Sequence, residues 1–189
     1  MARALRVPPL RDNKPLELTV EGQQFRVVHD VGDGTGTPLL LMNGIGAKLE
    51  LLQPFVDLLS PQRDIIRFDV PGVGGSPTAR HPYRLKGLAR KITGILKQLG
   101  FEKADVLGIS WGGGLAQQFA YSESAHCRKL VLVSTATGSI MVPAHPKILA
   151  KMITHRRYTD PDYLESVAHE IYGGTMRHNP TAALTALRQ

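Results

Sequence analysis

The chain has 189 residues, of which 42% are hydrophobic, 21% charged and 6% aromatic, and these proportions exclude a disordered, collagen-like or coiled-coil chain. Its single cysteine, Cys127, cannot form a disulfide within the chain and fits a reducing compartment, so we expect a cytoplasmic protein. No apolar run approaches the about 20 residues that span a bilayer, and we expect neither an integral membrane segment nor export.

Basic residues outnumber acidic ones, 23 to 16, which gives a formal charge of +7 and suggests nucleic-acid binding as one function to test against the sequence. Seven of the basic residues fall between positions 80 and 103, where leucine and isoleucine recur between them at helical spacing. This pattern is typical of the solvated face of an amphipathic helix. Aromatic residues are not interleaved with these charges, as stacking on single strands would need, so we predict no nucleic-acid partner.

Strands and helices alternate along the first 138 residues. Two short strands, 16–20 and 25–29, are predicted to form a hairpin. Buried strands, glycine-containing turns and helices then follow one another, and this alternation predicts an α/β fold, a mostly parallel sheet covered by helices on both faces. The expected strands are 38–42, 65–68, 104–109 and 129–133, and the expected helices are 49–59, 85–99 and 115–121.

The character of the sequence changes after residue 138. Prolines and glycines separate short helical stretches such as 161–171, and no further buried strand is predicted. We therefore predict two parts, the N-terminal part of the core sheet (1–138) and an incomplete helical cap region (139–189). The sequence stops inside an expected helix, 181–188, so we expect the fold to be C-terminally incomplete.

A G-x-S-x-G motif, Gly108 to Gly112, lies between a buried strand and a helix. Such a sharp turn strains the serine backbone and leaves room only for very small residues two positions before and after it. The turn also brings the Ser110 hydroxyl near the positive end of the helix, so the motif predicts a catalytic nucleophile. A helix N-cap serine or a phosphate-binding loop would be the alternatives, but no lysine follows the glycines as the latter requires.

An acyl-transfer serine also needs two backbone donors for the oxyanion. We assign one to the amide of Trp111, directly after the nucleophile, and the other to the amide of Ile45. Ile45 belongs to a turn that follows an earlier buried strand and consists of Asn43, Gly44, Ile45 and Gly46. A simple connecting turn is the alternative for this segment.

No acid or base for the serine can be assigned. Asp69 lies in another glycine loop and precedes the serine, whereas this architecture orders serine, acid and histidine, so we predict that it binds backbone amides. The histidines and acids after Ser110 follow no buried strand: His126, His145, His155, His169, His178, Asp160, Asp162, Glu165 and Glu170. We expect the acid and the base beyond Gln189, and we predict no metal site.

Several segments closely resemble the intracellular poly(3-hydroxyalkanoate) depolymerases for medium-chain-length polymers, which are members of the α/β-hydrolase fold. The resemblance runs from about Leu16 to the end of the chain. Its segments are NGIGAKLE (43–50), FDVPGVGGS (68–76), RHPYR (80–84), GISWGGGLAQQFA (108–120), MVP (141–143), RRY (156–158) and IYGG (171–174).

The resemblance implies hydrolysis of ester bonds in a stored polyester or its oligomers, releasing 3-hydroxyacids through an acyl-enzyme on Ser110. It implies no metal or organic cofactor, and a bacterial cytoplasm at the surface of storage granules. Apolar cap residues could then contact alkyl side chains or the granule, or simply pack the cap: Ile140, Met141, Val142, Tyr158, Tyr163, Ile171 and Tyr172. Family members carry the catalytic Asp and His in a C-terminal third that has no counterpart here.

Two alternatives stay open. One is another serine hydrolase of this fold, such as a short-chain carboxylesterase or a lipase, which substrate chain length would distinguish. The other is a non-catalytic granule-binding remnant. Related polymer synthases use cysteine as nucleophile, and dehalogenases and epoxide hydrolases use aspartate, so Ser110 argues against all three. The preferred chain length and the oligomeric state are not predicted.

Overall fold

The computed structural model describes residues 14–59, 62–136, 145–154, 156–173 and 178. The chain divides into two compact units, Met1–Ala136 and Thr137–Gln189. The first unit contains the sheet, and the second contains only helices among its described residues.

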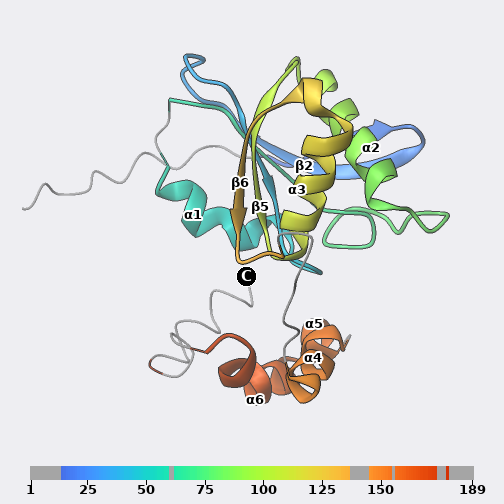
Figure 1. Ribbon diagram of the computed structural model, residues 1–189, viewed down its shortest axis with the longest axis vertical. Coiled ribbons are helices and arrows are strands. Elements are labelled where there is room, and N and C mark those ends of the chain that lie inside the picture. The colour runs from blue at the N-terminus through green and yellow to red at the C-terminus, as the bar shows by residue number, and fades with distance from the viewer. Residues whose placement is uncertain (1–13, 60–61, 137–144, 155, 174–177, 179–189) are drawn as a thin grey trace, which may run out of the picture. The chain divides into compact units, whose positions relative to one another are not determined.

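The first unit is built on a six-stranded sheet with the order β1-β2-β4-β3-β5-β6 (Figure 1). The strands are β1 (Leu16–Val20), β2 (Gln23–Asp30), β3 (Leu39–Met42), β4 (Ile65–Phe68), β5 (Ala104–Ile109) and β6 (Cys127–Val133). β1 and β2 form an antiparallel hairpin that joins β4 through β2, and β4, β3, β5 and β6 run parallel. The predicted mostly parallel sheet is confirmed, and the hairpin provides its antiparallel edge.

Alternating side chains of the central strands bury two separate apolar layers. Leu40 and Met42 of β3 belong to one layer, with α2 (Leu85–Gln98) and α3 (Trp111–Ser122). Leu39 and Leu41 belong to the other layer, with a 3₁₀ turn, η1 (Leu49–Leu52), and α1 (Gln53–Asp57). Helices therefore cover both faces of the sheet, as the sequence predicts.

Two helices differ from the prediction. The segment expected as one helix over 49–59 is the 3₁₀ turn η1 followed by the short α1, which has Pro54 in its first turn. Helix α3 begins at Trp111 and not at 115, so Gly112, Gly113 and Gly114 are helical in spite of their low propensity. The contacts that require glycine there are described below.

The second unit contains α4 (Pro146–Ile153), α5 (Arg156–Thr159) and α6 (Pro161–Ile171). The expected helix 161–171 is present, and the Asp160 side chain accepts a hydrogen bond from the Tyr163 amide, 3.0 Å away, at its start. Residues 140–142 and the expected helix 181–188 lie outside the described residues. No helix in the described part of the chain combines the length and apolar character of a membrane span.

The basic residues of α2 lie mainly on its solvent side. Lys86, Arg90 and Lys97 are exposed, whereas Ile92 and Leu96 on the opposite side are fully buried. The positive charge of this helix therefore accompanies an ordinary amphipathic pattern.

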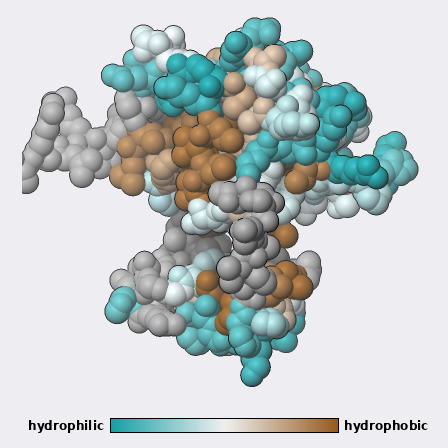
Figure 2. Space-filling model, viewed as in Figure 1, coloured by the Kyte–Doolittle hydropathy of each residue, from teal (hydrophilic) through white to brown (hydrophobic). Residues whose placement is uncertain are grey.

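Strand β6 has a single neighbour in the described sheet, β5, and carries partly exposed apolar side chains. Leu130, Val131 and Val133 are 38%, 46% and 38% exposed. Figure 2 shows hydrophobic surface over this side of the unit. An edge strand with exposed apolar side chains is a surface at which further β-structure can pair.

Asp105, at the start of β5, joins three segments through one nearly buried carboxylate. Arg128 donates to both of its oxygens, at 2.7 and 2.6 Å, and Arg63 donates to Oδ2 at 2.9 Å. Arg128 is an extra residue on β6 at a register shift, because Ala104 pairs with Cys127 whereas Asp105 pairs with Lys129. The hydrogen bonds from Arg128 lower the pKa of Asp105; burial opposes this shift and Arg63 adds to it.

We expect Asp105→Asn to lower the free energy of unfolding by about 2 kcal/mol near neutral pH, because an amide gives the two guanidinium groups no counter-charge. The folded-state pKa of Asp105 lies below its usual value of 3.8, so this stabilisation is fully present above 3.8 and is lost as the pH falls through the folded-state pKa. Urea unfolding across the acidic range measures the effect. If wild type and Asp105→Asn differed in free energy of unfolding by as much at about pH 2 as at neutral pH, the expectation would be contradicted. The exposed control Glu102→Gln should shift stability by less than about 0.5 kcal/mol.

Candidate active site

Ser110 occupies a strained turn between β5 and α3. Its backbone has φ 54° and ψ −119°, a region that residues with side chains rarely adopt. Hydrogen bonds hold the turn: the Ser110 amide donates to the Val133 carbonyl at 2.9 Å, and the Ser110 carbonyl accepts from the Thr135 hydroxyl at 2.7 Å. The residue is exposed, so its hydroxyl is accessible to a substrate.

The glycines around Ser110 are required by contact distances. A Cβ at Gly108 would lie 2.4 Å from the Gly112 carbonyl oxygen, and a Cβ at Gly112 would lie 2.1 Å from the Met42 carbonyl oxygen. Gly113 is equally constrained, since its Cβ would lie 2.5 Å from the Thr135 side chain. The sequence pattern marks Gly108 and Gly112 but not Gly113, whose only signal is the run of three glycines. These positions let α3 begin directly against β3 and β5.

The turn assigned to the oxyanion hole lies beside the serine. A Cβ at Gly44 would be 3.8 Å from the Ser110 Cβ, and Gly46 has φ +66°. The Asn43 side chain fixes the turn, because its oxygen accepts from the Gly44 amide and its nitrogen donates to the Lys48 carbonyl, both at 2.8 Å. The Gly44 amide is thereby occupied within the loop.

Ile45 and Trp111, the residues to which the two oxyanion donors are assigned, belong to different elements. Ile45 is 48% exposed in the turn next to Ser110. Trp111 is the first residue of α3, so its amide is one of those that a helix leaves without an intrahelical carbonyl. The predicted loop and the predicted elbow are thus brought to the same edge of the sheet.

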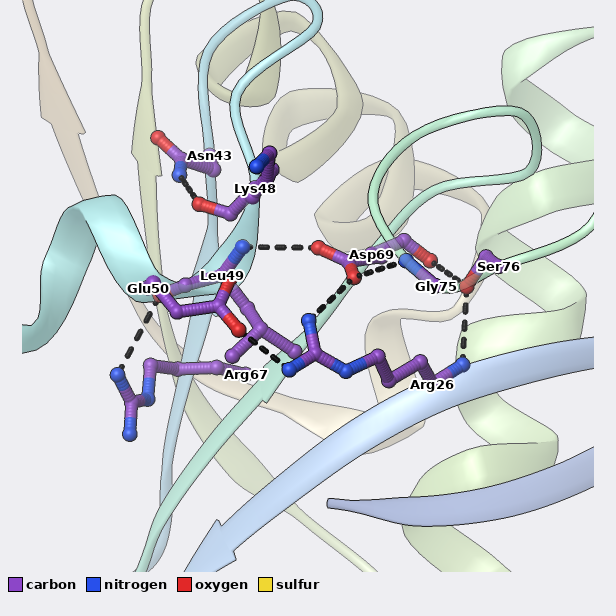
Figure 3. A network of polar contacts seen from close by, with 9 residues as sticks. All are labelled: Arg26, Asn43, Lys48, Leu49, Glu50, Arg67, Asp69, Gly75 and Ser76. Carbon is purple, nitrogen blue, oxygen red and sulfur yellow. Dashed lines mark hydrogen bonds and ion pairs between the residues drawn. The ribbon is translucent and has the colours of Figure 1, made fainter. Parts of the chain in front are cut away.

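Asp69 connects the loops at this edge of the sheet through hydrogen bonds and an ion pair (Figure 3). Its fully buried carboxylate accepts from the Leu49 amide at 2.8 Å and from the Gly75 amide at 2.9 Å, and it pairs with Arg26 at 3.1 Å. Leu49 begins η1 three residues after the turn that contains Gly46. Asp69 binds backbone amides as predicted, but these amides belong to two segments, Leu49 at the start of η1 and Gly75 in the glycine loop after β4.

Arg26 and Glu50 complete the network, and the sequence pattern does not mark either residue. The Arg26 guanidinium bridges Asp69 and Glu50, and the backbone amide of Arg26 donates to the Ser76 hydroxyl at 2.9 Å. Burial favours the neutral form of Glu50, but the hydrogen bond and charge of Arg26, a backbone hydrogen bond and the charge of Lys48 together lower the pKa of Glu50. The two carboxyl groups therefore share one guanidinium.

No acid or base partners Ser110 among the residues that the structure describes. His126 Nδ1 lies 2.6 Å from the Glu102 carbonyl oxygen, and His145 caps α4 by accepting from the Lys147 amide. His169 and Glu170 lie beside each other in α6, and Asp160 pairs with Arg156. His178 is exposed, and His155 lies outside the described residues. The described residues also contain no cluster of His, Cys, Asp or Glu that could hold a metal ion.

Residues 37–172 match the family model of the alpha/beta hydrolase fold. The chain therefore belongs to this family. Solved structures share its fold: Cfl2 from Burkholderia cenocepacia has a TM-score of 0.70 at 18% identity, covering 84% of this chain and 59% of that one. A hydrolase from Pseudomonas aeruginosa PA01 has a TM-score of 0.66 at 22% identity, covering 93% and 66%.

A poly(3-hydroxyalkanoate) depolymerase from Ectopseudomonas oleovorans is 48% identical over 165 residues, which are 87% of this chain and 58% of that protein. The resemblance identified from the sequence segments is thus confirmed. A soluble epoxide hydrolase from Corynebacterium is 28% identical over 129 residues, 68% of this chain and 45% of that protein. The chain spans about half the length of these curated relatives.

We expect Gly112→Ala to cost about 3 kcal/mol or more of unfolding free energy, because the added methyl group meets the backbone of β3 and cannot be accommodated by a side-chain rotation. Gly114→Ala is the matched control, since it lies in the same helix with open space around it. It should stabilise the protein by about 0.5–1 kcal/mol. Chemical denaturation of the two variants measures both; equal effects would contradict the packing argument.

We expect Asp69→Asn to loosen both loops that its carboxylate binds. The asparagine side chain has one oxygen, so it cannot accept both hydrogen bonds, and it gives Arg26 no counter-charge. The free energy of unfolding should therefore fall by about 3 kcal/mol. Hydrogen exchange provides the specific readout: the amides of Leu49 and Gly75 should lose protection more than amides in the centre of α2. Uniform loss across the first unit would show a global effect and contradict a local role.

Proposed function

We propose that this chain supplies the nucleophile and the oxyanion hole of a serine ester hydrolase that acts on poly(3-hydroxyalkanoate) or its oligomers. One observation carries the proposal: Ser110 is exposed at a positive φ between β5 and α3, with the turn containing Gly44 beside it. Strained residues persist where the surrounding structure enforces them, and such residues gather at active sites.

The proposed chemistry follows from this arrangement. The Ser110 oxygen adds to the ester carbonyl carbon while a base takes its proton, and the carbonyl oxygen becomes an oxyanion between the amides of Trp111 and Ile45. The carbon–oxygen bond to the leaving alcohol then breaks, and the alcohol takes the proton, leaving an acyl-serine. Water repeats the addition on the acyl-serine, which releases the carboxylic acid and restores the hydroxyl.

The substrate class is supported by the relative that is 48% identical and is named a poly(3-hydroxyalkanoate) depolymerase. The epoxide hydrolase relative is less similar, and epoxide hydrolases use an aspartate where this chain has Ser110. A different carboxylesterase or lipase is the second candidate, which substrate chain length distinguishes. The corresponding setting is a bacterial cytoplasm at the surface of polyester granules, with apolar cap residues such as Tyr163 and Ile171 as polymer contacts.

A fluorophosphonate probe tests the nucleophile directly. We expect labelling of the wild-type chain and complete loss in Ser110→Ala, whereas the exposed control Ser124→Ala should label normally, because the proposed oxyanion donors lie beside Ser110. Sites that lack triad members still reach about 10³–10⁴-fold over water, so slow labelling is sufficient. Absence of labelling would favour the non-catalytic granule-binding alternative.

Fusing the chain to the part of the depolymerase relative that it does not match provides a second readout with the same variants. Hydrolysis of 3-hydroxyalkanoate oligomers that requires Ser110 would support the proposal. A preference for short acyl esters over these oligomers would favour a general carboxylesterase.

A further inference from the structure

A cavity lies in the first unit, away from the elbow. It has a volume of about 370 Å³, which is within the range of small-molecule sites. Its walls come from the turn of the β1–β2 hairpin, from the loop 79–83 and from α2, which lie together in Figure 1. None of its lining residues belongs to the turn 43–46 or to the elbow 108–112.

Interactions within the walls hold the cavity in shape. The Lys91 ammonium donates to the Glu21 carbonyl at 3.1 Å and pairs with the Glu21 carboxylate at 3.3 Å. Arg90 also pairs with this carboxylate, at 2.9 Å, and the hydrogen bonds from both side chains lower the pKa of Glu21. The one acid in the lining is therefore already neutralised by two cations.

Two further basic residues of the lining, Arg80 and His81, make no ion pair with any residue that the structure describes. Both are exposed. The Tyr83 hydroxyl lies 3.5 Å from the Pro71 carbonyl oxygen, and burial raises the pKa of Tyr83, so the phenol remains a neutral donor. Because the Tyr83 hydroxyl already donates to Pro71, the donors of the lining that lack a carboxylate among the described residues are those of Arg80 and His81.

Apolar groups line the rest of the cavity. Pro82 and Ala79 present accessible carbon surface, and the buried side chains of Leu88 and Pro71 complete this part of the wall. A small polyanion such as phosphate would use the cation but not this surface. An aliphatic monocarboxylate would use both, with its charged end at Arg80 and its alkyl part against Ala79 and Pro82.

We propose that this cavity binds the carboxylate end of an aliphatic hydroxy acid, either as the free monomer or as the terminus of an oligoester. The proposal rests on the proposed function, because ester hydrolysis at Ser110 generates a carboxylate at each cut. Arg80 is the residue that recognises the charge, and the site is separate from the one that performs the chemistry.

Calorimetric titration of the chain with 3-hydroxyoctanoate, its methyl ester and a linear trimer with a free carboxylate tests the proposal. We expect the acid to bind and the methyl ester to bind at least about tenfold more weakly, since the ester removes the charge. Tighter binding of the trimer than of the monomer would identify the oligoester end as the ligand, and the reverse order would identify the free acid. Equal affinity for acid and methyl ester overturns the proposal.

Matched variants locate the site. Arg80→Gln should weaken binding of the acid about tenfold or more, and Ala79→Phe should do the same by filling the cavity without changing charge. Arg84→Gln is the control, because Arg84 carries the same charge four residues away, is exposed and does not line the cavity. Equal weakening by Arg80→Gln and Arg84→Gln would show non-specific attraction and overturn the proposal.

Probe labelling keeps this proposal separable from the proposed function. Ser110→Ala should bind the acid as the wild type does, since Ser110 is outside the cavity. Labelling of Ser110 without binding of the acid overturns the cavity proposal alone. Binding without labelling overturns the catalytic role of Ser110 alone.

Discussion

The close approach of α3 to the ends of β3 and β5 is the constraint on which the candidate site depends. Gly112 lies so near the Met42 carbonyl that any side chain would force the helix away, and Gly108 faces the first turn of the same helix. Ser110 stands between these two positions, so the chain can reverse direction there only with a positive φ. The unfavourable backbone of the serine is thus a consequence of packing around it, and the packing directs the residue outward.

The Asp69 network extends this constraint to the neighbouring loops. The elbow fixes Ser110, but a pair of oxyanion donors is useful only if the turn 43–46 keeps its position relative to the serine. Asn43 binds that turn to Lys48, and Asp69 binds the next residue, Leu49, to the glycine loop after β4. Buried charges are costly unless paired, and Arg26 supplies the pairing from the antiparallel strand β2. The hairpin therefore contributes to the site although it lies outside the parallel strands.

Short-range patterns were sufficient to predict the framework of the first unit. The strands 16–20, 65–68 and 104–109 have the predicted bounds, because apolar runs bounded by glycine and charged residues determine them locally. The start of α3 was wrong by four residues, since glycine propensity opposes a helix that tertiary contact requires. Arg26, Glu50 and Thr135 were missed because their roles depend on partners 24 or more positions away, which no local pattern encodes.

The sheet itself places the two candidate sites on a common edge. The turn with Gly44 follows β3, Pro71 follows β4 and Ser110 follows β5, and parallel strands all end at this edge. Because β3 lies between β4 and β5, the lateral offset from Pro71 to the nucleophile is about two strand spacings, roughly 10 Å, and the cavity extends further, toward β2. The wall of the cavity at Pro71 is thus held at a fixed distance from Ser110 by hydrogen-bonded strands, whereas Arg80 lies in the loop 79–83. Under the two proposals together, the sheet sets the distance from Ser110 to the wall at Pro71, and the loop sets where the chain end is bound.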